Sequence, residues 1–270
     1  VDATDLYVAW TDGRGLVFEG AALAGLGALL IWGARRFGLA VHDWARMRSE
    51  AITLDRFQID TVINDPAITW DEWVDRNILP VYGVERVEGA HGVWYREIRY
   101  AADRAQVRAT LVTARDQAGI MVRRAGPVVD ESVEVANEII VQFAPVLLGS
   151  RYGRTVAFTS EARAGDARFV THPLCSRSRE LFGLVSRTWI VGTTAHVSTA
   201  WEVARKLVEQ VAVPARLVTY EGGPELLDVL AAYDTVEVID SDDVATSYGV
   251  VQPGIVVSER TVRVTVRIPR

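Results

Sequence analysis

The residue types best suited to metal binding are sparse and scattered in this sequence. The four histidines are His42, His91, His172 and His196, and the single cysteine is Cys175. His172 and Cys175 have the spacing HxxC, which can supply two zinc ligands, but the sequence has no CxxC pair and no HExxH motif. We therefore predict that His172 lies near a helix N-terminus and that Cys175 is a small core residue.

The acidic residues with the closest spacing lie in one loop. Asp240, Asp242 and Asp243 cluster in the segment IDSDDVATS, where carboxylate oxygens could converge on calcium or magnesium. The loop lacks a DxDxDG pattern with a later Glu, which favours a solvated turn. A hydrolase with unmarked carboxylates stays an open alternative, because such catalytic pairs are set in space and not in sequence.

Nucleophile and phosphate-binding motifs are also missing. The sequence has no GxSxG elbow and no GxxxxGK[ST] loop. The glycine-rich segment from Gly20 to Ala34 has no strand-then-loop context, so its glycines favour close helix packing over phosphate binding. The same segment is uncharged for only about 15 residues, whereas a bilayer needs roughly 20. We predict a buried or interface helix and no membrane span, and we assign no catalytic, cofactor-binding or metal-binding residue and no enzyme activity.

The eight tryptophans raise the possibility of carbohydrate binding. Trp70, Trp73 and Trp201 fall on the apolar faces of predicted helices and are expected in the core. Trp94 and Tyr95 are adjacent in a predicted strand and point to opposite faces, so one of them is expected to be exposed or at an interface. The alternative function is therefore a module that binds cell-surface glycans through exposed aromatic side chains.

Composition bounds the class of protein. The chain has 270 residues, of which 49% are hydrophobic and 24% charged, as in ordinary globular proteins that divide into one or two domains. The net charge of -6 removes the electrostatic case for nucleic-acid binding. Lys206 is the only lysine, which favours a GC-rich genome as the cause of the arginine excess. The sequence begins at Val1 and not at Met, so we expect a processed chain or an ordered piece of a longer polypeptide, and we favour the second because residues 1–10 resemble the middle of a structured segment.

Helices and one hairpin dominate the first third of the sequence. The predicted hairpin turns around Gly89–Gly92. Two capping boxes are predicted, Thr69 with Glu72 and Thr199 with Glu202, and Pro80 is expected to end the first of these helices. Asp71, Glu72 and Asp75 lie on the polar side of that helix. In the first third, helices are predicted at Gly20–Phe37, His42–Leu54 and Thr69–Pro80. Two further helices are predicted later in the chain, at Pro173–Phe182 and Thr199–Val211.

Strands dominate from Ala109 onward, so we predict a helical and hairpin domain over 1–108 and a barrel-rich domain with two helices over 109–270. The clearest strand is the last one. There Val262, Val264, Val266 and Ile268 alternate with Thr261, Arg263, Thr265 and Arg267, which predicts one buried and one solvated face.

In the order of these elements, the sequence resembles the tail-tip hub proteins of long-tailed bacteriophages and of phage-derived gene transfer agents. The stretches that carry the resemblance cover roughly Asp60 to Ile268. One departure is His172, where an acidic residue is expected before the proline. The stretches are TWDEWVDRNILPVYGVERVEGAHGVWYREI, SVEVANEIIVQFAP with Asn137 before the apolar run, HPLCSRSRELFG, TAWEVARKLVEQVAVPARLVTYEG, YDTVEVID and the closing hairpin.

The resemblance implies an α+β fold of small antiparallel β-barrels of the phage tail-hub type, with packed helices. It implies a structural virion protein at the tail tip that closes the tail tube and anchors fibres or a spike. The partners would be other copies in a homotrimeric ring, the distal tail ring, the tape measure, and fibres or a spike. Arg263, Arg267 and Arg270 would then face the tube lumen or a neighbouring subunit, with a solvated strand face as the equal alternative.

Overall fold

The computed structural model describes residues 8–11, 16–17, 25–37, 41–63, 68–115, 117–131, 134–146, 151–161, 163, 165–241, 246–258 and 260–269. The chain forms two compact units, and each takes two stretches of sequence. The first unit holds residues up to 98 together with 136–208, and the second holds 99–135 together with 209–270. The predicted division between 108 and 109 falls inside strand β6 (Val107–Val112).

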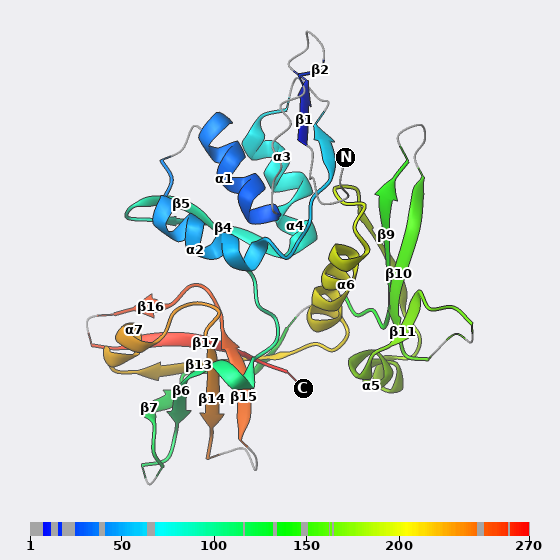
Figure 1. Ribbon diagram of the computed structural model, residues 1–270. Coiled ribbons are helices and arrows are strands. Elements are labelled where there is room, and N and C mark those ends of the chain that lie inside the picture. Colours follow the sequence, from blue (N-terminus) through cyan, green and yellow to red (C-terminus); the bar gives the residue numbers. More distant parts are fainter. Residues whose placement is uncertain are drawn as a thin grey trace. The chain divides into compact units, whose positions relative to one another are not determined.

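Helices of the first unit lie side by side (Figure 1), and glycine lets them approach closely. A Cβ placed on Gly27 would lie 2.4 Å from Cα of Ala51, and one on Gly33 would lie 2.0 Å from the ring of Trp70. The prediction of close helix packing is thus confirmed for the described part of the apolar segment. No helix among the described residues is long and apolar enough to span a bilayer. The helices are α1 (Leu26–Phe37), α2 (Trp44–Leu54), α3 (Trp70–Asn77), α4 (Leu79–Tyr82), α5 (Pro173–Phe182) and α6 (Val197–Val211).

Helix ends confirm one capping box and correct the other. The Thr69 hydroxyl accepts from the Glu72 backbone N–H, and the Glu72 carboxylate accepts from the Thr69 N–H. Thr199 does not cap α6, because this helix begins at Val197 and the Thr199 hydroxyl instead bonds both backbone groups of Gln58. Pro80 does not end α3 either, since it lies in the first turn of the separate helix α4, where a missing N–H costs nothing.

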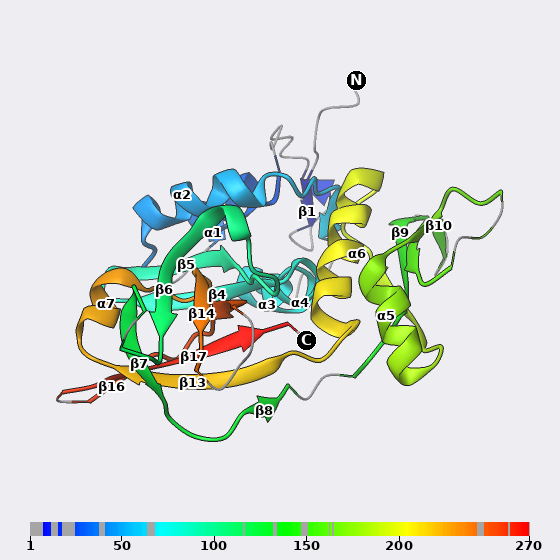
Figure 2. The ribbon, with the colours of Figure 1, turned by 90° about the horizontal axis from the view of Figure 1, so that it is seen from below.

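A four-stranded sheet packs beside α6 in the first unit. Its order is β11-β10-β9-β12, with β9 antiparallel to β10 and parallel to β12. Phe158 of β10 contacts Trp201 of α6 with ring centroids 5.0 Å apart, and α6 lies beside these strands in Figures 1 and 2. The strands are β9 (Glu138–Pro145), β10 (Tyr152–Thr159), β11 (Phe169–Thr171) and β12 (Ser186–Val191). The unit also holds β1 (Val8–Thr11), β2 (Leu16–Val17), β3 (Thr61–Ile63) and the predicted hairpin, β4 (Val84–Gly89) with β5 (Gly92–Glu97).

The second unit is a closed six-stranded barrel. The strands follow the order β17-β15-β14-β6-β7-β13, and β13 pairs back with β17 over seven residues. The pairs β6–β14 and β6–β7 are parallel and the other barrel pairs are antiparallel, so the predicted α+β class with a small barrel is confirmed, with two parallel pairs inside it. The other elements are β7 (Ile120–Arg124), β8 (Val129–Asp130), β13 (Arg216–Gly222), β14 (Thr235–Ile239), β15 (Ser247–Val251), β16 (Val256–Val257), β17 (Val262–Ile268), the 3-10 turn η1 (Arg104–Gln106) and α7 (Glu225–Val229).

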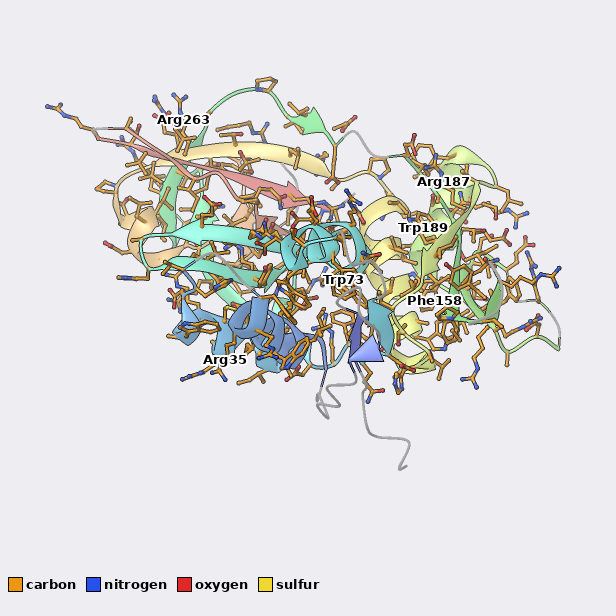
Figure 3. The ribbon with its side chains drawn as sticks, turned by 90° about the horizontal axis from the view of Figure 1, so that it is seen from above. Arg35, Trp73, Phe158, Arg187, Trp189 and Arg263 are labelled. Atoms are coloured by element: carbon orange, nitrogen blue, oxygen red, sulfur yellow. The ribbon has the colours of Figure 1, made fainter. Side chains whose placement is uncertain are left out.

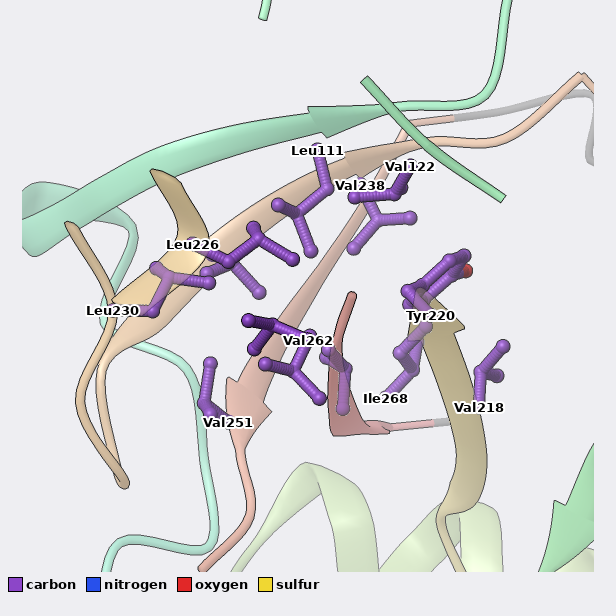
Figure 4. Packing of buried hydrophobic residues seen from close by; sticks show 13 residues of the cluster. Leu111, Val122, Val218, Tyr220, Leu226, Leu230, Val238, Val251, Val262 and Ile268 are labelled. Atoms are coloured by element: carbon purple, nitrogen blue, oxygen red, sulfur yellow. The ribbon is translucent and has the colours of Figure 1, made fainter. Parts of the chain in front are cut away.

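Branched aliphatic side chains fill the barrel (Figure 4). The four predicted inward residues of the last strand, Val262 to Ile268, are all buried. Leu226 of α7 and the following Leu230 are buried in the same cluster. Burial of such side chains contributes roughly 1.5–3 kcal/mol each, so this core dominates the stability of the unit.

Candidate interaction surfaces

The HxxC pair forms part of a helix start and part of the core. His172 caps α5, since its Nδ1 accepts from the Leu174 backbone N–H at 3.2 Å. Cys175 is fully buried one turn later. Both predictions are confirmed, and no group of three or more His, Cys, Asp or Glu residues that could hold a metal occurs among the described residues.

We expect the Cys175 thiol of the folded protein to resist alkylation. Burial raises its pKa to about 12, so the reactive thiolate is scarce at pH 8. Iodoacetamide should modify the native chain at least about a hundredfold more slowly than the chain in urea. The sequence has one cysteine, so intact mass reports one site. Rapid modification of the folded chain would contradict this placement.

Asp240 is buried, which corrects the prediction of a solvated turn at this residue. Its carboxylate accepts from Arg124 at 2.6 Å and from the Tyr220 hydroxyl at 3.2 Å. Both partners lie on barrel strands, so Asp240 ties the end of β14 to β7 and β13. Asp242 and Asp243 lie outside the described residues.

Aromatic side chains do not form an exposed platform at the hairpin. Trp94 and Tyr95 are 7% and 2% exposed, so the prediction that one of them is accessible is wrong. Trp94 lies under Arg46, whose guanidinium carbon is 4.3 Å from the ring centroid. Helix α2 covers the face of the hairpin that carries Trp94, a face that alternation along the strand would leave exposed to solvent. Trp70 and Trp73 stack in the core as predicted.

The arginines of the last strand have different environments. Arg263 is 56% exposed and lies at the surface in Figure 3. Arg267 is 2% exposed and binds Glu131, the Tyr100 carbonyl and the Glu209 carbonyl. All three partners belong to the same unit as Arg267. Both alternatives predicted for Arg267, a lumen or neighbour contact and a solvated strand face, are therefore wrong, and Arg270 lies outside the described residues.

A row of charge crosses three barrel strands on the outside. Arg123 on β7, Glu221 on β13 and Arg263 on β17 are direct cross-strand neighbours. Glu221 accepts from Arg263 at 2.7 Å and from Arg123 at 2.5 Å, and these hydrogen bonds hold its pKa below the usual value. Alternation along the strand predicts that Arg263 points outward. Only the register of the paired strands shows that one carboxylate accepts hydrogen bonds from two arginines.

A second charged cluster lies on α3 and the hairpin of the first unit. Arg86 binds Asp75 at 3.0 Å and Asp71 at 3.3 Å, both from Nη2. The two carboxylates are the polar-face residues that the sequence predicted for this helix. The sequence did not predict Arg86 as their partner, because nothing in it shows which strand residue lies opposite the helix.

The only lysine is part of a mostly buried network. Lys206 Nζ donates to Glu97 at 2.7 Å and to the Gly83 carbonyl at 3.2 Å, and Arg56 also binds Glu97. Burial raises the pKa of Glu97, but the hydrogen bonds and charges of Arg56 and Lys206 outweigh it and the pKa is lowered overall. The network joins α6 to the hairpin and to the end of α2.

We expect Glu97 to make the first unit less stable in acid. A carboxyl whose pKa is lowered on folding contributes stability above its unfolded pKa, and this is lost as the pH falls through the folded pKa. Glu97→Gln should cost about 2 kcal/mol at pH 7 and make the decline in stability below about pH 4.5 shallower. Thermal unfolding between pH 7 and pH 3 measures both effects. Glu88→Gln, at an exposed position of the same hairpin, should change neither.

Comparisons with known proteins gave structural likenesses only. No family model and no curated protein matches the chain. A structure described as the virion of a native gene transfer agent particle is 14% identical over 75% of this chain, with a TM-score of 0.40. A tail protein from Neisseria meningitidis MC58 is 13% identical over 77% of this chain, also at 0.40, and a prophage tail protein from Listeria monocytogenes EGD-e is 14% identical over 77%, at 0.38. The chain spans 40%, 57% and 56% of the lengths of these three proteins.

Proposed function

We propose that this chain is a structural protein of a phage-type virion, and that it forms the hub at the tail tip. It closes the tail tube and anchors fibres or a spike. Its role is mechanical, and no residue in it is assigned to catalysis.

One observation carries this proposal. The stretches that resemble the hub family in sequence are those that build the two sheets and the helices that pack on them. SVEVANEIIVQFAP supplies β9, HPLCSRSRELFG supplies α5, and the segment from Thr199 supplies most of α6 and then β13. The closing hairpin supplies β17, which closes the barrel by pairing with β13. The resemblance therefore follows folded elements and is not a matter of composition.

The proposed partners are other copies of the chain in a homotrimeric ring, with the distal tail ring, the tape measure and the fibres or spike as neighbours. A ring needs two different surfaces on each subunit that complement each other. The exposed charged clusters on the two units are candidates for such surfaces. The glycan-binding alternative has lost its main support, because Trp94 and Tyr95 are both buried.

The test is assembly. The purified chain, alone and with the tail proteins encoded beside it, should give the mass of a trimer or of a larger complex by light scattering, and a three-fold ring by negative-stain microscopy. A capsid protein from the same virion serves as the non-binding control. A chain that stays monomeric at every concentration and binds none of the tail proteins would refute the proposal.

A further inference from the structure

The outer face of the barrel carries an excess of one positive charge in the row around Glu221. The Glu221 side chain is 5% exposed and both of its oxygens are engaged, one by Arg123 and one by Arg263. The two arginines are 76% and 56% exposed. Each donates one N–H to Glu221, and their other N–H groups have no partner among the described residues. The carboxylate therefore holds two guanidinium groups together, and most of their N–H donors remain able to bind a partner.

The surface of the first unit carries the opposite excess around Arg86. Asp75 and Asp71 are 47% and 37% exposed, and each uses one oxygen on the same Arg86 nitrogen. They are four residues apart on α3, which places them about 6 Å apart along one face of the helix. Their second oxygens have no partner among the described residues. The cluster thus presents two acceptors where the barrel row presents two sets of donors.

We propose that the Arg123–Glu221–Arg263 row of one copy of this chain binds the Asp71–Arg86–Asp75 cluster of a second copy. The inference rests on the proposed function, because it names the contact through which a ring would close. Arginine and carboxylate pair in a bidentate geometry that an exposed guanidinium can adopt at little cost. The two clusters have equal and opposite net charge, so neither is left with an unpaired charge when they meet.

Three features favour a second copy as the occupant. Both clusters belong to this chain, so each copy supplies both sides of the contact. They lie on different units and are unlike each other, and a heterologous contact of this kind generates a ring when the rotation closes. A nucleic acid fits poorly, because the barrel row has a net charge of about one and binding to phosphates needs many cations together.

Charge reversal of one residue on each side tests the contact. Arg123→Glu and Asp75→Arg should each weaken self-association of the full chain by about tenfold or more, because like charges then face each other. The double variant should regain the wild-type affinity to within about threefold, since the pair is restored with its charges exchanged. Association is measured by sedimentation equilibrium and mass photometry, and thermal midpoints report that each variant is folded.

Matched controls separate this contact from net charge. Arg115→Glu and Asp60→Arg make the same charge changes at exposed residues outside both clusters and should leave association unchanged. A wild-type oligomer that survives both reversals would overturn the inference while the proposed function stands. A wild-type chain that is monomeric throughout would overturn the ring itself. Binding of duplex DNA that is lost in Arg123→Glu, without any change in self-association, would also overturn the inference.

Discussion

Replacing Arg267 by alanine should lower the free energy of unfolding of the barrel unit by about 3–5 kcal/mol. The guanidinium is the largest fully buried polar group of the chain among the described residues, and it binds three segments that lie far apart in sequence. Its Nε donates to Glu131 at 2.9 Å, while its other nitrogens donate to the carbonyls of Tyr100 and Glu209. Alanine would leave the Glu131 carboxylate, whose side chain is 20% exposed, and two carbonyl groups without their donor.

The same strand offers the matched control. Arg263→Ala removes an arginine four residues earlier, where the side chain is 56% exposed and Glu221 keeps Arg123 as a partner. It should cost less than about 1 kcal/mol. Urea and thermal unfolding, monitored by a spectroscopic signal from the barrel unit, measure the free energy of unfolding of both variants. Equal costs for the two variants would show that Arg267 is not held as the structure places it.

Alternation in the last strand predicted which residues fill the barrel, and it did so because a strand repeats every two residues. Val262, Val264, Val266 and Ile268 are all buried. The same pattern could not separate Arg263 from Arg267, because both point to the outside of the barrel. What differs is the segment lying over them. Tyr100 and Glu131 come from elsewhere in the chain, and no local pattern states that they cover one end of β17.

Local sequence signals predicted where helices occur better than they predicted the residue at which each helix begins. The helix α5 was predicted with both of its bounds, since Pro173 and Gly183 are strong start and stop signals. The Thr199–Glu202 spacing also fits a capping box, but Thr199 is buried against Gln58 and the helix starts earlier. A tertiary contact thus replaced a local one, and the sequence carries no mark of it.

The charged clusters of the two units depend on register and on packing between elements. Glu221 meets two arginines because β13 lies between β7 and β17. Arg86 meets Asp71 and Asp75 because the hairpin lies under α3. Neither neighbour is close in sequence, so these surfaces could be found only from the folded chain.

Asn137 is the residue on which the start of the four-stranded sheet depends. Its side chain is fully buried, and its Nδ2 donates to the Gly183 carbonyl at 2.6 Å while its Oδ1 accepts from the Val185 N–H at 2.9 Å. One amide therefore satisfies a carbonyl and an N–H in the turn that leads from α5 to β12. A planar amide can do both, because it carries a donor and an acceptor side by side.

Replacing Asn137 by aspartate should cost about 3 kcal/mol or more at pH 7. The carboxylate keeps the bond from Val185 but turns an oxygen toward the Gly183 carbonyl, and it buries a charge with no cation among its hydrogen-bond partners. Its folded pKa should be raised, so the loss should shrink as the pH falls and the protonated acid donates to Gly183. Thermal unfolding at pH 7 and pH 5 measures this, with Asn77→Asp on the half-buried end of α3 as the control, expected to cost under about 1 kcal/mol. A stability loss that stays constant with pH would argue against the Gly183 contact. Recovery of stability in acid would assign the loss to the hydrogen bond to Gly183, which an ionised aspartate cannot donate.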